Sequence, residues 1–328
     1  MPPELVLTPV VGSPWRTALV RVGLAWSALF ALTYAEWAEM AHQWWDIDTY
    51  NHVLLVPAIL AWLVWLRREE LAKIEPTAWW PGLAWVSGAL AVWLGGRAAD
   101  INLVAQAGVV LAFQGAVLSL LGVRAALIMA FPLLYAAFLV PFGDELIPAL
   151  QHITAQLTVG LTHASGVPAI IDGLFIDTPG GKFVVAEECS GVKFLIAMVA
   201  LTSLVAWTGF ISWSRRVALV GGAALVSILA NGVRAWGTIY VAQYVGAERA
   251  GGFDHIVYGW VFFAVVIAAV LGVSWRFFER EPTEAGLSAG ETAAHPLAGF
   301  ERHAIAPDLA LAVIASTAIV FAALAALV

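Results

Sequence analysis

Charged residues are scarce in this chain: only 12% of its 328 residues are charged, while 61% are hydrophobic. Soluble domains carry about twice that charged fraction, so the composition excludes an ordinary soluble protein. Cysteine is scarcer still, and the one residue, Cys189, excludes an internal disulfide. Phosphate loops, dinucleotide fingerprints and metal-ligand spacings are also missing. We therefore expect no cofactor, no metal site and no nucleic-acid partner.

Long apolar runs take the place of charge. A helix needs about 20 apolar residues to cross the hydrocarbon core. The runs predict spans at residues 17–38, 52–66, 79–96, 102–122, 125–141, 190–211, 217–241, 256–275 and 307–328. The fold class is therefore an all-α polytopic membrane protein, a bundle of about eight transmembrane helices plus one C-terminal span.

The basic residues predict how these spans are oriented. With the N-terminus in the cytoplasm, most Lys and Arg residues fall in cytoplasmic loops, as the positive-inside rule requires. We predict a transmembrane domain over 1–280, a flexible cytoplasmic linker over 281–306 and a C-terminal span over 307–328. That last span would end outside, where a periplasmic domain can follow if the chain is a shortened form.

The longest external segment, residues 142–188, is expected to be structured. Its first part predicts a periplasmic amphipathic helix, with an apolar stripe at Leu146, Leu150, Ile153, Leu157 and Leu161. The opposite face carries Gln151, His152, Gln156 and Thr158. Two β-like runs follow, 169–177 and 182–187, and the turn residues 178–181 between them predict a short β-hairpin.

Three reactive side chains come near the predicted outer ends of three successive spans: Cys189, Arg234 and His255. A thiolate is a strong nucleophile, imidazole can move its proton, and guanidinium can stabilise an oxyanion. Antiparallel neighbours joined by short connections usually pack together. The pattern therefore predicts a cysteine nucleophile with two helpers, although each residue also has a structural interpretation as a packing or interfacial residue.

Six further residues are candidates for supporting or substrate-binding roles. Lys193 can act on the thiol, bind a substrate carboxylate or extend to the interface. Asn231 shares a helix face with Arg234 and can orient it or join two helices. Each of the others has a structural alternative, as a close-packing glycine, solvated turn charges or a structural histidine: Gly259, Glu187, Glu188 and His52.

Three ordered blocks carry a resemblance to a known family. They are AEECSGVK at 186–193, NGVR at 231–234 and HIVYG at 255–259, supported by DTYNH at 48–52, PFGD at 141–144 and GVP at 166–168. They resemble the signature motifs of the exosortases, over about residues 40–275, and the chain looks closest to the exosortase A type. Lys193 and Glu188 depart from the arginine and the small residue that are common there.

The resemblance implies a cysteine transpeptidase or endopeptidase, multi-pass in the bacterial inner membrane, with its active site facing the periplasm. Such enzymes process proteins with a C-terminal PEP-CTERM signal, which consists of a Pro-Glu-Pro motif, a transmembrane helix and a basic tail. By this resemblance Cys189 attacks the peptide bond, Arg234 stabilises the oxyanion and His255 is the acid and base. Expected partners are PEP-CTERM proteins, membrane lipids and an acceptor linked to exopolysaccharide production.

Two other functions are open at this point. An intramembrane cysteine protease would use the same three residues with water as the acceptor, and the sequence does not separate it from a transpeptidase. A transporter would also place polar residues within spans. It would, however, concentrate charge near the bilayer midplane and in paired halves, whereas these polar residues gather toward one edge.

Overall fold

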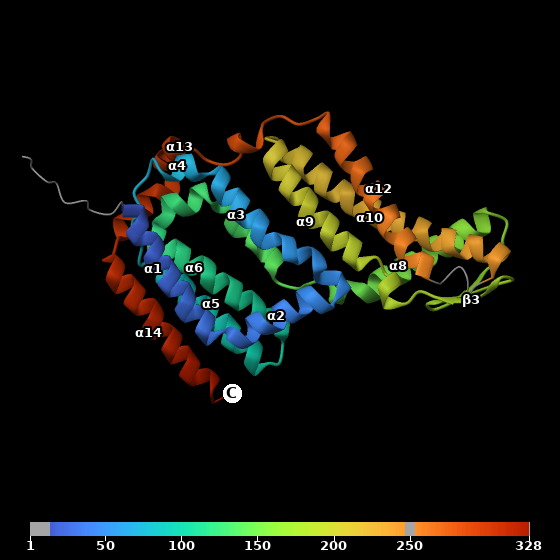
Figure 1. Cartoon of the computed structure of the whole chain (residues 1–328), viewed down its shortest axis with the longest axis horizontal. Coiled ribbons are helices and arrows are strands. Elements are labelled where there is room, and N and C mark those ends of the chain that lie inside the picture. Colours follow the sequence, from blue (N-terminus) through green and yellow to red (C-terminus); the bar gives the residue numbers. More distant parts are fainter. Residues whose placement is uncertain (1–13, 247–252, 328) are drawn as a thin grey trace, which may run out of the picture. The chain divides into compact units, whose positions relative to one another are not determined.

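The computed structural model of the chain describes residues 14–246 and 253–327, with the side chains of the second range from residue 259 onward (Figure 1). Five of the described helices are long and apolar enough to cross a membrane, or up to seven if each of two sharply bent helix pairs is one span. This result confirms an all-α polytopic membrane protein. Among the residues that the structure describes, length and composition thus support five to seven crossing helices, against nine predicted spans.

The chain divides into two compact units, of which the first lies within Met1–Gln43, Leu55–Val140 and Gly286–Val328. Its elements are α1 (Pro14–Leu32), most of α2 (Tyr34–Asp46), α3 (Val56–Leu66), α4 (Arg68–Leu71), α5 (Pro81–Ala98), α6 (Asn102–Ile128), α7 (Ala130–Tyr135), η2 (Ala136–Leu139), α13 (Ala289–Ala294), η6 (Pro296–His303) and α14 (Pro307–Ala325). The C-terminal span that the sequence sets apart is α14, which packs on α1 and α5 within this unit (Figure 1).

Helices α5 and α6 form a closely packed antiparallel pair in the first unit. A Cβ atom at Gly96 would lie 2.3 Å from the backbone nitrogen of Ala105, and one at Gly108 would lie 2.4 Å from that of Trp93. Glycine therefore allows the two backbones to touch. Close packing of this kind is typical of membrane helices, because lipid tails supply no hydrophobic force between them.

Two predicted spans are interrupted where the backbone turns. α1 ends at Leu32, and α2 leaves it at an angle of 84°, so the span predicted at 17–38 ends early. Gly122, inside α6, has a φ of 84°, and a Cβ there would lie 2.3 Å from the Thr77 carbonyl oxygen. Only glycine fits such a position. This turn separates the spans predicted at 102–122 and 125–141, and the second of these is itself divided at Met129 between the end of α6 and α7, which η2 follows.

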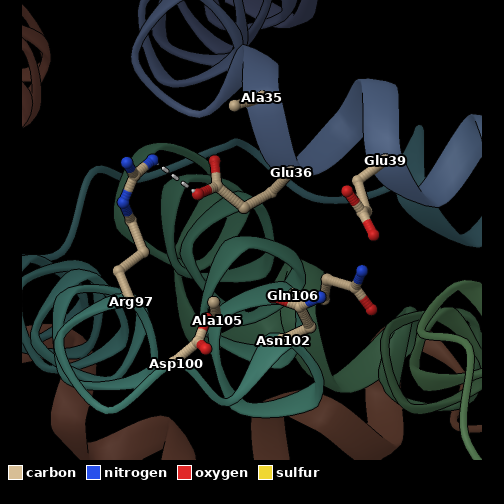
Figure 2. A pocket seen from close by; sticks show the side chains of 8 residues that line it. All are labelled: Ala35, Glu36, Glu39, Arg97, Asp100, Asn102, Ala105 and Gln106. Atoms are coloured by element: carbon tan, nitrogen blue, oxygen red, sulfur yellow. Dashed lines mark hydrogen bonds and ion pairs between the residues drawn. The ribbon is translucent and has the colours of Figure 1, made fainter.

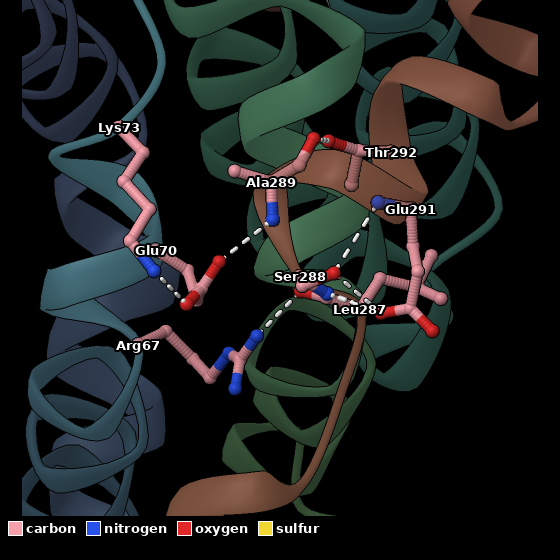
Figure 3. A network of polar contacts seen from close by, with 8 residues as sticks. All are labelled: Arg67, Glu70, Lys73, Leu287, Ser288, Ala289, Glu291 and Thr292. Carbon is pink, nitrogen blue, oxygen red and sulfur yellow. Dashed lines mark hydrogen bonds and ion pairs between the residues drawn. The ribbon is translucent and has the colours of Figure 1, made fainter.

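The flexible linker predicted over 281–306 is largely folded onto the first unit. Figure 3 shows Arg67 and Glu70 facing this segment: Arg67 donates to the Leu287 carbonyl, and Glu70 Oε2 accepts from the Ala289 N–H at 2.7 Å. Trp79 pairs with Ala304 in an isolated β-bridge. The composition is that of a linker, but capped helices and these backbone contacts hold it in place.

Helix α13 begins with a reciprocal cap that satisfies its first backbone groups. The Glu291 N–H donates to Ser288 Oγ at 3.2 Å, and Glu291 Oε2 accepts from the Ser288 N–H at 2.8 Å (Figure 3). Because the Ser288 backbone and hydroxyl donate to it, the pKa of Glu291 is lowered. Lys73, at 2.5 Å, and the Ala289 N–H likewise lower the pKa of Glu70.

Acidification is expected to loosen residues 287–294. A carboxyl group whose pKa is lowered by folding stabilises the fold above its unfolded pKa of about 4.3, and this contribution is lost as the pH falls through the lower folded value. Hydrogen exchange, corrected for intrinsic rates, should show lower protection of these amides at about pH 3 than at pH 7. The double variant Glu70→Gln, Glu291→Gln should lose most of this difference in protection between the two pH values. Glu75→Gln, at an exposed position, should keep it. Equal protection at both pH values in the native chain would contradict this prediction.

The second unit lies within Trp44–Leu54 and Pro141–Ala285. Its elements are most of η1 (Asp48–Leu55), η3 (Asp144–Leu146), α8 (Ile147–Ala164), β1 (Ile170–Asp172), β2 (Phe175–Thr178), β3 (Gly181–Val184), η4 (Glu187–Cys189), α9 (Val192–Gly209), α10 (Trp213–Val245), α12 (Phe253–Trp275) and η5 (Pro282–Glu284). Helices α8, α9 and α12 all pack against α10. This unit contains every residue predicted for the site.

The predicted β-hairpin forms strands β2 and β3 of a three-stranded antiparallel sheet in the order β1-β2-β3. Strands β2 and β3 pair where the sequence predicts the turn, with Thr178 opposite Gly181. The first predicted run is wrong as a single strand, because Gly173 has a φ of 60° and the chain reverses there, which separates β1 from β2. The sheet leads through η4 into α9.

Helix α8 occupies the place of the predicted amphipathic helix, but the expected faces are partly wrong. Gln151 and Thr158 are buried, whereas Ile153 of the apolar stripe is 42% exposed. Gln151 is held inside by the hydrogen bond that it donates to the Val185 carbonyl at 2.8 Å, and its neighbour Thr154 donates to the Ser190 carbonyl at 3.4 Å. In a membrane protein polar groups turn inward to such partners.

Candidate active site

Cys189 lies where the sheet joins α9. Its backbone N–H donates to the Ala186 carbonyl at 2.9 Å, which closes the short turn η4. The side chain is half-buried and packs against a cluster that includes Val185 and Ile239. The thiol therefore stands on ordered backbone, packed between β3 and α10.

Asn231, on α10, ties this turn to two neighbouring helices. Its Nδ2 donates to the Cys189 carbonyl at 2.8 Å and to Thr154 Oγ1 of α8 at 3.0 Å. The side chain is only 4% exposed, so both bonds lie away from solvent. These bonds agree with the interpretation of Asn231 as a residue that joins helices, and the same amide also holds the backbone of the cysteine.

Gly191 allows Asn231 to approach so closely. Its φ of 86° is in the left-handed region, and a Cβ would lie 2.6 Å from Asn231 Cγ. Only a residue without a side chain satisfies both the backbone angle and this contact. The Ser190-Gly191 pair therefore serves as the tight link between Cys189 and the first turn of α9.

Arg234 lies one turn beyond Asn231 on the same face of α10. The residue is 6% exposed, and its guanidinium carbon is 5.5 Å from the centre of the Phe194 ring of α9. A buried arginine is costly in a membrane helix, at about 2.5–3.5 kcal/mol near the bilayer centre, and such residues face the bundle interior. The structure places Arg234 in that way.

The beginning of α12 runs beside Arg234. A Cβ atom at Gly259 would lie 2.8 Å from Arg234 Nη1, so the guanidinium fills the space that a side chain would take. His255 precedes Gly259 by four residues, one turn, in α12. Its backbone therefore shares a helix face with Gly259, while its side chain lies outside what the structure describes.

Lys193, in the first turn of α9, faces the carboxylate of Asp48. Its Nζ is 3.9 Å from Asp48 Oδ2, and it lies 5.3 Å from the ring centre of Phe194 and 6.0 Å from that of Trp260. The side chain is 21% exposed. Asp48 belongs to the block at 48–52, so this ion pair joins two of the sequence blocks.

The remaining candidates lie apart from these contacts. Glu187 and Glu188 are exposed, and among the described residues neither carboxylate has an ion-pair partner. His52 Nδ1 lies 3.1 Å from the Thr49 carbonyl within its own turn. No hydrogen bond or ion pair within the described part of the chain joins these three residues to Cys189 or Arg234.

Several residues of the site escape a sequence-based search. Thr154 and Phe194 look like ordinary helix residues, yet one binds Asn231 and the other lies under Arg234. The Ser190-Gly191 dipeptide is a turn signal, but nothing in the neighbouring sequence indicates that the Asn231 side chain packs against Gly191. Such partners come from other helices, so sequence spacing does not identify them.

One of three comparisons with known proteins identifies a family. Neither the curated proteins nor the solved structures compared with the chain gave a match. A family model described as transmembrane exosortase matches residues 44–272, which is more than half of the chain and includes Cys189, Arg234 and His255. On this match, the chain belongs to the transmembrane exosortase family.

Proposed function

We propose that this exosortase is a cysteine transpeptidase with Cys189 as its nucleophile. The hydrogen bond of 2.8 Å from Asn231 to the Cys189 carbonyl carries the proposal. It holds the cysteine against the face of α10 that presents Arg234 one turn later. Gly259 then brings the beginning of α12, and with it His255, to the same arginine.

The three side chains supply complementary steps of acyl transfer. His255 takes the thiol proton, and the Cys189 sulfur forms a bond to the carbonyl carbon of the scissile peptide. The carbonyl electron pair moves to oxygen, which becomes an oxyanion facing the Arg234 guanidinium. His255 then gives its proton to the leaving nitrogen as the carbon–nitrogen bond breaks, and a thioester remains on Cys189.

The second half of the reaction releases the product. An acceptor amine or hydroxyl attacks the thioester carbon while His255 removes its proton, and the sulfur leaves as a thiolate. Water in place of the acceptor would give a free carboxylate, which is the protease alternative. Arg234 serves both halves, since each passes through an oxyanion at the same position.

The substrate we propose is a protein with a C-terminal PEP-CTERM signal, cleaved at the periplasmic face of the bacterial inner membrane. This assignment follows from the resemblance and the orientation of the basic residues. Lys193 and the exposed Glu187 and Glu188 lie close to Cys189 in the sequence, and we assign their charges to selection of the signal. An acceptor linked to exopolysaccharide production completes the proposal.

The test is co-expression with a tagged protein that carries such a signal. If the enzyme transfers its substrate, the product should be shorter than the substrate but heavier than the cleaved chain alone, by the mass of the acceptor. A thioester intermediate should also form on Cys189, and hydroxylamine should cleave it. The matched control substrate has alanines in place of Pro-Glu-Pro and should stay intact. A product with a free carboxylate and no adduct would favour hydrolysis, and a substrate that stays full-length would contradict the proposal.

A further inference from the structure

A polar pocket lies in the first unit, where α2 passes the turn between α5 and α6. Its polar lining residues are Glu36, Glu39, Arg97, Asp100, Asn102 and Gln106 (Figure 2). The cavity volume is about 230 Å³. A water molecule occupies about 30 Å³ in the liquid, so there is room for a small organic group.

Glu36 is the central group of this pocket. The residue is 8% exposed, and its Oε1 accepts from Arg97 Nη1 at 2.9 Å. Figure 2 shows the carboxylate extending from α2 toward the Arg97 guanidinium. The second oxygen, Oε2, is also buried and has no hydrogen-bond partner among the described residues. A buried carboxylate oxygen without a donor is costly, and a ligand that brings a donor would relieve the cost.

The charged residues around Glu36 indicate what charge the ligand carries. Arg97 is held by Glu36 on one side, and its guanidinium lies 5.7 Å from the centre of the Trp93 ring. With Glu39 and Asp100, the lining carries three carboxylates and one guanidinium, a formal charge of −3 + 1 = −2. The pocket therefore favours a cation over an anion.

The geometry favours an organic cation over a metal ion. No group of three His, Cys, Asp or Glu side chains in the described part of the chain is placed to hold a metal. An ammonium group donates three hydrogen bonds, for which this pocket offers carboxylates and the amides of Asn102 and Gln106. Gln106 is 2% exposed and donates to Gln43 Oε1 at 3.3 Å, so its side chain is fixed.

We propose that this pocket binds the protonated primary amine of a small molecule or a lipid headgroup. The ammonium donates to Oε2 of Glu36, and the carboxylates of Glu39 and Asp100 add favourable negative charge to the lining. The site lies at the turn that ends α5, a place that headgroups and dissolved amines both reach if α6 crosses the membrane. This inference is independent of the proposed acyl transfer, because it uses no residue of the Cys189 site.

The experiment measures amine binding to the purified full chain. Titration calorimetry with ethanolamine is expected to show saturable binding, and Glu36→Gln and Asp100→Asn should each weaken it at least tenfold. Asn tolerates the positive φ of 55° at residue 100, so Asp100→Asn keeps the backbone and decides the matter if Glu36→Gln fails to fold. Glu75→Gln, an exposed carboxylate of the same unit, is the control and should bind normally.

A second measurement identifies the source of the amine. Nanodiscs with phosphatidylethanolamine, compared by native mass spectrometry with phosphatidylglycerol, should give retained lipid that Asp100→Asn loses if the ligand is a headgroup. Binding of ethanolamine without lipid retention supports a dissolved amine. Absence of amine binding, binding unchanged in both variants, or equal competition by sodium would overturn the proposal. Cys189→Ala should bind ethanolamine like the native chain, so failure of the proposed transpeptidase leaves this result interpretable.

Discussion

Replacing Cys189 with alanine is expected to lower processing of a PEP-CTERM substrate by at least about 10⁴-fold, because removal of a covalent nucleophile leaves only binding and oxyanion stabilisation. The thiol is half-buried, and its position depends on backbone bonds of η4 and the Asn231 amide. Alanine keeps all of these bonds, so the fold should survive. Initial rates of cleavage in membranes that contain equal amounts of enzyme are the measurement.

Two controls separate chemistry from structure in that experiment. Ser203→Ala makes a similar small change within α9, away from η4, and should leave the rate unchanged. The melting temperature of Cys189→Ala should equal that of the native chain. Cleavage at the native rate by Cys189→Ala would eliminate this residue as the nucleophile, and with it the proposed mechanism.

Replacing Arg234 with lysine is expected to reduce kcat about 100-fold with little change in KM, as is typical when one oxyanion donor is lost. Lysine keeps the positive charge but lacks the planar fork. The shape of the site makes the loss specific, because Gly259 leaves space for a flat guanidinium against α12 and Phe194 lies on its other side. Single-turnover rates with a saturating substrate would measure the effect.

The same helix offers a matched control for this change. Arg215 lies in the first turn of α10, where its Nη1 is 2.9 Å from Glu279 Oε1. Lysine can replace it in that ion pair, so Arg215→Lys should turn over normally. A kcat within threefold of the native value for Arg234→Lys would rule out the oxyanion role, whatever Arg215→Lys does.

Composition and hydropathy predict the fold class because long apolar runs indicate helices that are surrounded by lipid. They do not predict breaks such as Gly122, whose positive φ matches a close contact with Thr77 from another segment. The segment over 281–306 shows the same limit. Its residues are typical of a linker, and contacts with residues far away in the sequence, among them Arg67, Glu70 and Trp79, hold it in place.

The local sequence pattern identifies some residues of the site but not the contacts between them. Cys189 stands out because it is the one cysteine of the sequence, and Arg234 because it lies within a predicted apolar span. Their relation is made by Asn231, Thr154 and Gly191, which lie on separate elements up to 77 positions apart in the sequence. Glu187, Glu188 and His52 share the same blocks, yet nearness along the chain does not bring them into contact with Arg234.

The first unit is built from three separate segments of the sequence, and this constrains the order in which the protein assembles. Helix α14 packs on α1, although residues 33–306 lie between them in the sequence. A ribosome delivers the N-terminal helices first, and domains generally fold as their residues emerge. Helices α1, α5 and α6 therefore keep one side uncovered until residues 307–325 have been synthesised, while the stretch from 141 to 285 can already assemble. Quality-control proteases would thus meet this half of the molecule unfinished for longer than the half that bears the thiol.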